Sequence, residues 1–294
     1  MLVVALPGGA ATAAALASEL QCPVTELVVH RFPDGETLVR IDAPVQGECV
    51  VLAGSLHQPD SKTLPLLFAA DAARELGAAR IGLVAPYLSY MRQDARFHPG
   101  EAVTSRSYAR LLSTAVDFLV TVDPHLHRWN SLTDIYAIPS TVVPSASAIA
   151  LWLRNQVSEP LLVGPDSESA QWVAEVARLA HAPWTAMVKT RRGDRDVSVV
   201  LQPDPAWRGR TAVLLDDIVS TGHTMAAAAE ALRDAGFTAP TCIAVHALFE
   251  DGAMERLKAA GAGRIASCDT VSHATNAIPL GPLLAQATQA LAER

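Results

Sequence analysis

The chain has 294 residues, of which 50% are hydrophobic and 18% are charged, so it can form one large or two ordinary domains and is not a disordered protein. Its formal net charge of -7 excludes a global attraction to nucleic acid or to an anionic membrane. A polyanionic ligand must therefore meet a local cluster of Arg and Lys. The four cysteines are widely spaced and show no CxxC or Cys/His ligand pattern, which indicates reduced, partly buried thiols.

The first 20 residues are apolar, but they lack a positively charged start, and Pro7, Gly8 and Gly9 interrupt the run. We therefore expect a strand, a turn and a helix here and not a signal peptide. No stretch reaches the roughly 20 uninterrupted apolar residues that a membrane helix needs. The sequence predicts a cytoplasmic protein without a membrane partner.

Short apolar runs typical of buried strands alternate along the chain with Ala-rich segments of helical spacing. The predicted strands are 49–55, 80–87, 117–123, 161–166, 211–217, 241–248 and 264–269. The predicted helices are 63–76, 105–114, 169–180, 225–235 and 252–260. This alternation predicts an α/β fold with two tandem doubly wound domains and mainly parallel sheets. A segment rich in Pro and Ser at 138–145 predicts the seam, with domains at 1–140 and 141–294.

Two polar segments of the first half are candidates for a nucleotide site. In the segment FPDGE, Phe32 can stack on a base, and Asp34 and Glu36 can accept from an amino group, although Pro-Asp-Gly is also an ordinary turn signal. In YMRQD, the side chains of Arg92, Gln93 and Asp94 suit a phosphate and the water around Mg²⁺. The alternative for this second segment is a solvated loop with an isolated ion pair.

Two further strand ends carry groups that can bind a metal ion. His125 follows Asp123 directly after a predicted strand, and a neutral imidazole can serve as a ligand or can hydrogen-bond to a phosphate. A pair of surface histidines is the alternative, which we accept for His127. Asp166 in GPDSES is interpreted equally well as a helix cap and as a metal ligand.

The segment 184–200 predicts a hairpin whose tip, 191–196, is too charged for a protein core. Lys189 and Arg191 lie two residues apart, so in an extended strand they project from the same face. Two cations on one face of a flap can neutralise charge that develops on a transferring phosphoryl group. A basic surface hairpin is the alternative.

The most informative segment is VLLDDIVSTGHT, in which an apolar strand leads to Asp216 and Asp217 and then to a short loop that opens a helix. Backbone N–H groups of such a loop and of the helix N-terminus bind phosphate, and Ser220, Thr221 and Thr224 add hydroxyls. The adjacent carboxylates can accept from ribose hydroxyls or hold hydrated Mg²⁺. Because the Walker lysine is absent, we expect a phosphate monoester and not a triphosphate tail. A strand end followed by a helix cap is the alternative.

The same segment resembles the phosphoribosyl pyrophosphate binding motif of type I phosphoribosyltransferases and of ribose-phosphate pyrophosphokinases. The segments FPDGE, YMRQD, DPH, GPDSES, KTR and DDIVSTGHT occur in one order, and together they resemble the ribose-phosphate pyrophosphokinase family over nearly the whole chain. The resemblance implies two phosphoribosyltransferase-like domains, the N-terminal one for ATP and the C-terminal one for ribose 5-phosphate. It also implies transfer of a diphosphoryl group from MgATP to the C1 hydroxyl of ribose 5-phosphate, with AMP as the other product.

Carried over motif by motif, the resemblance assigns residues to ATP binding, to Mg²⁺ binding, to catalysis and to ribose 5-phosphate binding. Phe32, Asp34 and Glu36 would hold adenine across a subunit boundary of a homo-oligomer, and Arg92, Gln93 and Asp94 would contact the ATP phosphates. His125 and Asp166 match Mg²⁺-linked positions, and Lys189 and Arg191 match the catalytic loop. The ribose 5-phosphate site would comprise Asp216, Asp217, Ser220, Thr221, Gly222, His223 and Thr224.

Three positions depart from the family pattern. His223 stands where many relatives have Gly, Ser220 replaces a common acidic residue, and GPDSES replaces a more Gly-rich turn. FPDGE, KTR and RQDARFHPGE are closer to the archaeal-type branch than to the phosphate-activated bacterial enzymes. Two other functions stay open, namely a non-catalytic regulatory homologue and a phosphoribosyltransferase.

Overall fold

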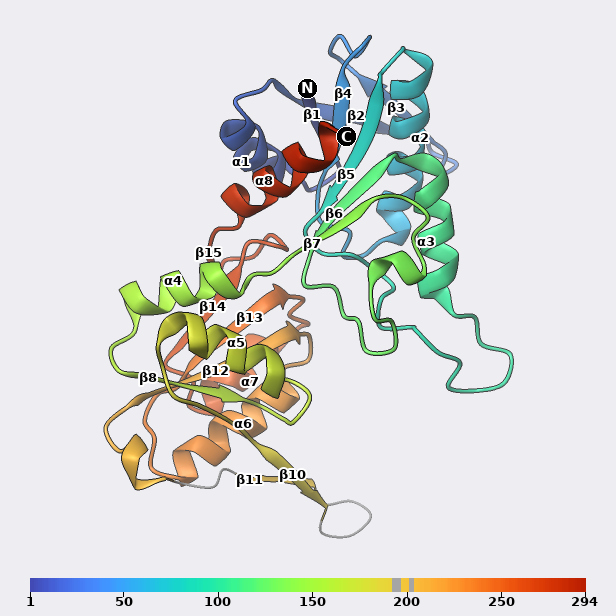
Figure 1. Cartoon of the computed structure of the whole chain (residues 1–294). Helices are drawn as coiled ribbons and strands as arrows, with labels where there is room; N and C mark the ends of the chain where they lie inside the picture. The colour runs from blue at the N-terminus through green and yellow to red at the C-terminus, as the bar shows by residue number, and fades with distance from the viewer. Residues whose placement is uncertain (192–196, 201–203) are drawn as a thin grey trace. The chain divides into compact units, whose positions relative to one another are not determined.

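The computed structural model describes residues 1–191, 197–200 and 204–294, and for residues 188–191 and 197–200 it describes the backbone without the side chains. The chain forms two compact units (Figure 1). The first unit comprises Met1–Val143, Thr270–Ser272 and Leu280–Arg294, and the second comprises Pro144–Asp269 and His273–Pro279. In the described part, no helix combines the length and the apolar character needed to span a membrane.

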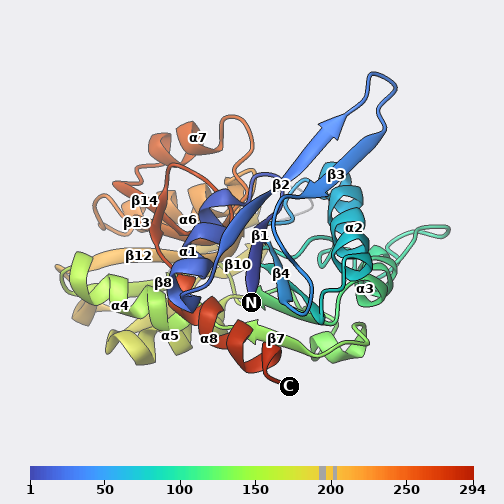
Figure 2. The ribbon, with the colours of Figure 1, turned by 90° about the horizontal axis from the view of Figure 1, so that it is seen from above.

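The first unit is built on a seven-stranded sheet in the order β3-β2-β1-β4-β5-β6-β7. Its strands are β1 (Leu2–Ala5), β2 (Val24–Arg31), β3 (Thr37–Ile41), β4 (Cys49–Ala53), β5 (Arg80–Ala85), β6 (Phe118–Val122) and β7 (Ser140–Val143). All neighbours are parallel except β2 and β3, which form an antiparallel hairpin at one edge. Figure 2 shows this hairpin extending beyond the rest of its sheet.

Helices cover both faces of this sheet, which explains why β4, β5 and β6 consist almost entirely of buried residues. The helices are α1 (Ala10–Leu20), α2 (Asp60–Glu75), α3 (Thr104–Ala115) and α8 (Gly281–Ala292), with a short 3-10 turn η1 (Leu132–Asp134). Helices α1 and α8 pack together on one face and α2 and α3 on the other (Figure 1). Helix α3 buries Tyr108, Ala109 and Leu112 at helical spacing and exposes the remaining face.

The second unit contains a six-stranded parallel sheet in the order β15-β14-β13-β12-β8-β9. Its strands are β8 (Pro160–Gly164), β9 (Trp184–Ala186), β12 (Thr211–Val219), β13 (Thr241–Ala247), β14 (Arg264–Cys268) and β15 (Asn276–Ile278). Its helices are α4 (Ala146–Gln156), α5 (Ala170–Ala180), α6 (His223–Asp234) and α7 (Ala253–Ala259), with a 3-10 turn η2 (Pro205–Trp207). Helices α4 and α5 lie on one face and α6 and α7 on the other (Figures 1 and 2).

The predicted α/β fold with mainly parallel sheets is confirmed, and each of the seven predicted strands is present. Two local predictions are wrong. The strand predicted to end at Asp217 continues to Val219, so both aspartates lie within β12. The hairpin predicted over 184–200 begins later, because β9 joins the parallel sheet beside β8, and only β10 (Val188–Arg191) and β11 (Val197–Val200) form an antiparallel pair.

Candidate active site

In both units the polar segments identified in the sequence follow the carboxyl ends of parallel strands. Such strand ends meet at one edge of each sheet, where open α/β folds bind their ligands. In the first unit YMRQD and DPH follow β5 and β6, which are neighbours in the sheet, and FPDGE connects β2 to β3 at one edge of it. In the second unit they follow β8 and β12, which are also neighbours.

The turn of the β2–β3 hairpin presents three of the candidate residues to solvent. The backbone N–H of Phe32 donates to the carbonyl of Glu36 at 2.9 Å, and the N–H of Glu36 donates to Oδ1 of Asp34 at 3.1 Å. The Phe32 ring stands edge-on to the ring of His30, with 4.7 Å between centroids, and is 41% exposed. The turn therefore offers a fixed aromatic face beside two carboxylates, which suits a purine with an amino group.

The loop after β5 divides its three candidates into exposed and buried side chains. Arg92 and Gln93 are exposed, and the side-chain oxygen of Gln93 accepts from the hydroxyl of Thr104 at the start of α3. The Asp94 side chain is only 2% exposed, and its carboxylate accepts a 2.7 Å hydrogen bond from Nη1 of Arg128. Asp94 therefore holds the loop in place, while Arg92 and Gln93 are available to a ligand.

Strand β6 leads into a segment with two stacked imidazole rings. The rings of His125 and His127 lie with their centroids 3.9 Å apart and their planes at 23°. Asp123, which precedes them, has a φ of 31°, and its backbone N–H donates to the carbonyl of Val143. This left-handed backbone turns the chain sharply where the strand ends, so the segment leaves the sheet at its binding edge.

In the second unit two carboxylates of β12 lie near a third carboxylate in the loop that follows β8. Loss of hydration raises the pKa of Asp216 well above its usual range, and the charges of Asp217 and Asp166 raise it further. Asp166 also accepts from the backbone N–H groups of Glu168 and Ser169 at 3.1 and 3.2 Å, just before α5. Asp166 thus forms a turn in the loop before α5, whose N-cap residue is Ser169 without a side-chain cap, and contributes negative charge to the same region.

The loop between β12 and α6 has the geometry of an anion site. Gly222, with a φ of 75°, caps α6, and His223 and Thr224 are exposed in the first turn of that helix. The first N–H groups of an α-helix have no acceptor within the helix and bind phosphate readily. The loop is held from outside, because Nη1 of Arg256 donates to the carbonyl of Thr221 and the N–H of Glu250 donates to that of Ser220 at 3.1 Å.

Lys189 and Arg191 lie on β10, which pairs with β11 so that Lys189 is opposite Val199 and Arg191 opposite Val197. Their side chains, and residues 192–196 of the predicted hairpin tip, fall outside what the structure describes. Their assignment to the catalytic loop stays a prediction.

A pair of basic side chains that lies at the end of β4, Lys62 with His57, was not predicted from the sequence. The Lys62 ammonium donates to the carbonyl of Ser55 at 2.9 Å and lies 3.1 Å from Nδ1 of His57. Lys62 is 9% exposed, and burial lowers its pKa. Burial also lowers the pKa of His57, and the charge of Lys62 lowers it further. The feature of the sequence that could have indicated this pair is Gly54-Ser55 directly after an apolar strand.

Arg128 was also missed, although it is the only Lys or Arg in the segment 123–135. Among the residues that the structure describes, no group of three or more His, Cys, Asp or Glu side chains is arranged to hold a metal ion.

Comparison with known proteins gives one consistent result over the whole chain. Residues 1–115 match the family model described as the N-terminal domain of ribose phosphate pyrophosphokinase, and residues 131–283 match the phosphoribosyl transferase domain model. The ribose-phosphate pyrophosphokinase of Methanopyrus kandleri is 34% identical over 99% of both chains. That of Halobacterium salinarum is 34% identical over 94% of this chain and 96% of its own.

Among solved structures, the phosphoribosylpyrophosphate synthetase from Mycobacterium smegmatis matches with a TM-score of 0.85 and 26% identity. The match covers 99% of this chain and 98% of that one.

Proposed function

The chain belongs to the ribose-phosphate pyrophosphokinase family. On that basis we propose which of its residues bind each substrate and which stabilise the transition state. The enzyme transfers the diphosphoryl group of ATP to the C1 hydroxyl of ribose 5-phosphate and gives phosphoribosyl pyrophosphate and AMP. The observation that carries the residue assignment is the strand, loop and helix from Asp216 to Thr224, which joins paired carboxylates to a helix N-terminus.

This segment binds ribose 5-phosphate in our proposal. The 5-phosphate accepts from the backbone N–H groups of residues 220–224 and from the hydroxyls of Ser220, Thr221 and Thr224. Asp216 and Asp217 accept from the ribose hydroxyls and so fix the direction of the C1 hydroxyl. His223 is exposed at the first position of α6, so its side chain lies at the rim of the loop and can donate to the phosphate.

The first unit binds ATP. Phe32 stacks on adenine, Asp34 and Glu36 accept from its amino group, and Arg92 and Gln93 contact the phosphates, while Asp94 acts through Arg128 to hold that loop. Because the β2–β3 hairpin is exposed, we further propose that it serves adenine bound to a neighbouring subunit of a homo-oligomer (Figure 2).

The chemistry requires alignment and charge neutralisation, and no residue forms a covalent intermediate. Lys189 and Arg191 stabilise the negative charge on the transferred group and on the departing AMP. Bound Mg²⁺ would neutralise charge on the polyphosphate, and we propose His125 in the first unit and Asp166 in the second as separate candidate ligands.

Support for a cation in the second unit comes from Asp216, whose pKa is raised chiefly by burial and then by the negative charges of Asp217 and Asp166, so that a cation there would offset repulsion among three carboxylates. Mg²⁺ takes few protein ligands and keeps several waters, so a complete protein cage is not needed. We place the reaction in the cytoplasm, in agreement with four cysteines that are all free thiols.

The test is incubation of the purified protein with MgATP and ribose 5-phosphate, with AMP and phosphoribosyl pyrophosphate followed together. We expect equal amounts of the two products, and none from the Asp216→Asn/Asp217→Asn double variant. ADP as product would contradict diphosphoryl transfer. Binding of both substrates without turnover would select a regulatory homologue, and turnover only with a nucleobase and the sugar diphosphate would select a phosphoribosyltransferase.

A further inference from the structure

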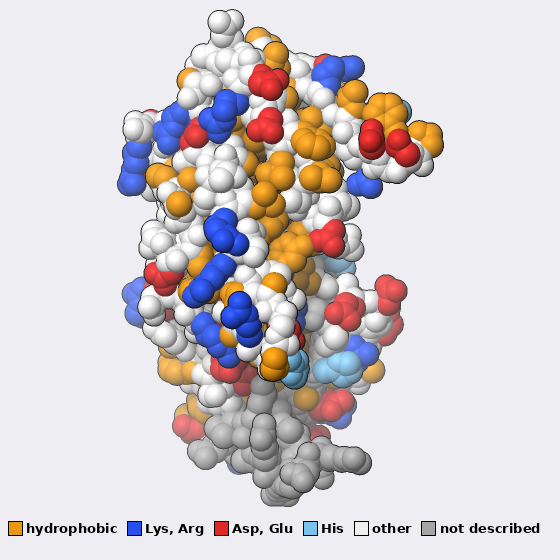
Figure 3. All heavy atoms as spheres, turned by 90° about the vertical axis from the view of Figure 1, so that its right-hand side faces the viewer, with side chains coloured by type: hydrophobic (Ala, Val, Ile, Leu, Met, Phe, Trp, Pro, Cys, Tyr) orange, Lys and Arg blue, Asp and Glu red, His pale blue; other side chains and the backbone are white. Residues whose placement is uncertain are grey.

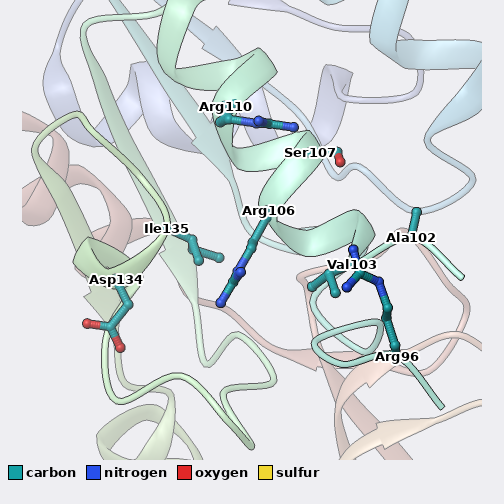
Figure 4. Close-up of a pocket in the computed structure, with 8 residues that line it drawn as sticks. All are labelled: Arg96, Ala102, Val103, Arg106, Ser107, Arg110, Asp134 and Ile135. Atoms are coloured by element: carbon teal, nitrogen blue, oxygen red, sulfur yellow. The ribbon is translucent and has the colours of Figure 1, made fainter. Parts of the chain in front are cut away.

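The loop between β12 and α6, which we call the β12–α6 loop, contains no lysine or arginine. Neither residue type occurs anywhere from Thr211 to Leu232. The first unit differs, because Arg96, Arg106 and Arg110 line one hollow there (Figure 4), and basic side chains gather on the face that carries α3 (Figure 3). The β12–α6 loop must therefore bind the 5-phosphate with backbone N–H groups and hydroxyls. Its affinity for a phosphate then depends on the direction in which those N–H groups point.

Two consecutive carbonyl groups of the β12–α6 loop are held by the segment that follows β13. The carbonyl of Ser220 accepts from the backbone N–H of Glu250 at 3.1 Å. The carbonyl of Thr221 accepts from Nη1 of Arg256, which lies in α7. The first bond uses the backbone alone, so any residue except proline could make it at position 250. The second bond depends on the arginine side chain.

The bond from Arg256 sets the direction of one N–H group of the loop. In a planar trans peptide unit the C=O and N–H bonds point in opposite directions. The unit that joins Thr221 to Gly222 has its carbonyl directed at Arg256, so the N–H of Gly222 is directed away from that side chain. No described residue accepts from the N–H of Thr221 or of Gly222. Both donors are therefore left for a ligand.

Helix α7 also lies directly against Gly222. A Cβ at Gly222 would stand 3.5 Å from the carbonyl oxygen of Ala253 and 3.7 Å from Cγ of Leu257. Ala253 and Leu257 are fully buried, whereas Arg256 is partly exposed. One helix thus supports the loop in two ways, with an apolar surface against Gly222 and with a charged donor to the carbonyl of Thr221.

An arginine that only stabilises the packing of α6 and α7 is the ordinary alternative. It predicts a loss of stability when Arg256 is replaced and no separate effect on ligand affinity. Two observations favour a role in binding. The guanidinium makes no other hydrogen bond or ion pair with a described residue, and its acceptor, the carbonyl of Thr221, lies in the loop itself and not in α6. The bond therefore acts on the loop that is proposed to hold the phosphate.

We propose that Arg256 is a positioning residue that directs the N–H of Gly222 toward the phosphate group of ribose 5-phosphate. This inference rests on the proposed function of the β12–α6 loop. Arg256 acts on the ligand through the peptide unit between Thr221 and Gly222 and needs no contact with the sugar phosphate. Without this bond the peptide unit can rotate, and its N–H is no longer held in the direction that suits the phosphate. A donor that is already oriented before binding saves the free energy of ordering it.

The experiment is calorimetric titration of the full chain and its variants with ribose 5-phosphate. Arg256→Met removes the donor and should weaken binding about tenfold or more, as expected for a lost hydrogen bond from a charged group. Arg256→Lys keeps a charged donor and should bind within about threefold of the wild type. Arg154→Met is the matched control, because Nη1 of Arg154 donates to the carbonyl of Leu179 at 2.9 Å in the same unit. It should change the affinity by no more than about twofold.

Steady-state kinetics supplies a readout that a purely structural role would not move selectively. Arg256→Met should raise the KM for ribose 5-phosphate about tenfold and leave kcat and the KM for ATP within about twofold, because only ground-state binding is lost. Thermal unfolding checks that both Met variants are folded. Wild-type affinity of folded Arg256→Met would overturn the positioning role and leave the proposed function intact, as would equal weakening by Arg154→Met. Failure of the wild-type chain to bind ribose 5-phosphate would contradict the proposed function itself, and this inference with it.

Discussion

The carboxylate of Asp94 accepts a 2.7 Å hydrogen bond from Nη1 of Arg128, and this ion pair joins the loops that follow β5 and β6. The Asp94 side chain is 2% exposed and the Arg128 side chain is 53% exposed. The guanidinium also lies 5.3 Å from the ring centroid of Phe97. The pair thus fixes the segment of Arg92 and Gln93 against the segment of His125.

Replacing Arg128 with Met should destabilise the fold by about 1–3 kcal/mol, because the buried Asp94 carboxylate loses a charged partner. Chemical denaturation measures this change. The Asp94→Asn/Arg128→Met double variant should be less destabilised than the sum of the single variants. Arg40→Ala, which breaks a fully exposed pair with Asp42, should change the stability much less than the replacement of Arg128. Equal losses for Arg40 and Arg128 would contradict the anchoring role of Asp94.

Phe32→Ala should raise the KM for ATP about 5- to 150-fold, since stacking of a base on an aromatic ring is worth roughly 1–3 kcal/mol. The KM for ribose 5-phosphate and the thermal stability should hardly change, because the ring is exposed at a hairpin turn. Steady-state kinetics with each substrate varied checks both points. His30→Ala, which removes the ring beside Phe32, should have a smaller effect of the same sign. An unchanged KM for ATP would remove Phe32 from the adenine site.

Gly222→Ala should weaken binding of ribose 5-phosphate and destabilise the fold by about 1 kcal/mol, because its φ of 75° is costly for a residue with a Cβ. Gly236→Ala is a matched control, because Gly236 has a similar φ of 89°. A Cβ at Gly236 would meet no atom of the described residues within 4 Å, apart from its chain neighbours. Both variants should lose similar stability, and only Gly222→Ala should lose affinity in calorimetry. Equal affinity of the two variants would place the phosphate elsewhere.

The pKa of His57 is lowered from 6.5 by burial and by the charge of Lys62. Lys62→Gln should therefore raise this pKa, as measured by NMR titration of the imidazole. Because the unfolded chain binds the proton more readily, stability should fall as the pH drops from about 6.5 through the lowered pKa. This loss should be smaller in Lys62→Gln. A pKa that is unchanged or lower in the variant would exclude electrostatic coupling of the two side chains.

Lys189→Ala should lower kcat by about two orders of magnitude and leave the affinity for ribose 5-phosphate nearly intact, as expected for a group that stabilises the transition state. Arg208→Ala removes an exposed cation of the same unit and should leave kcat unchanged. Turnover and equilibrium binding are measured for both variants. A parallel loss of affinity and turnover would make Lys189 a substrate-binding residue.

The α/β class, the positions of the central strands and the polar segments that follow them could be predicted from the sequence alone. These features are local, because a fully buried parallel strand needs a short apolar run and a covering helix needs apolar residues at helical spacing. The β2–β3 hairpin was not predicted as a pair of strands, since its partly exposed residues at the sheet edge carry a weaker pattern.

Contacts between residues far apart in the chain became evident only in the folded protein. Asp94 pairs with an arginine 34 residues away, and Asp166 adds its charge to that of Asp216 from a neighbouring strand. Helix α8 packs in the first unit, where Nη1 of Arg80 donates to the carbonyl of Leu291 at 2.8 Å across 211 residues. Such contacts depend on the order of the strands in the sheet and on which apolar surfaces are buried against each other. A local pattern of residues determines neither.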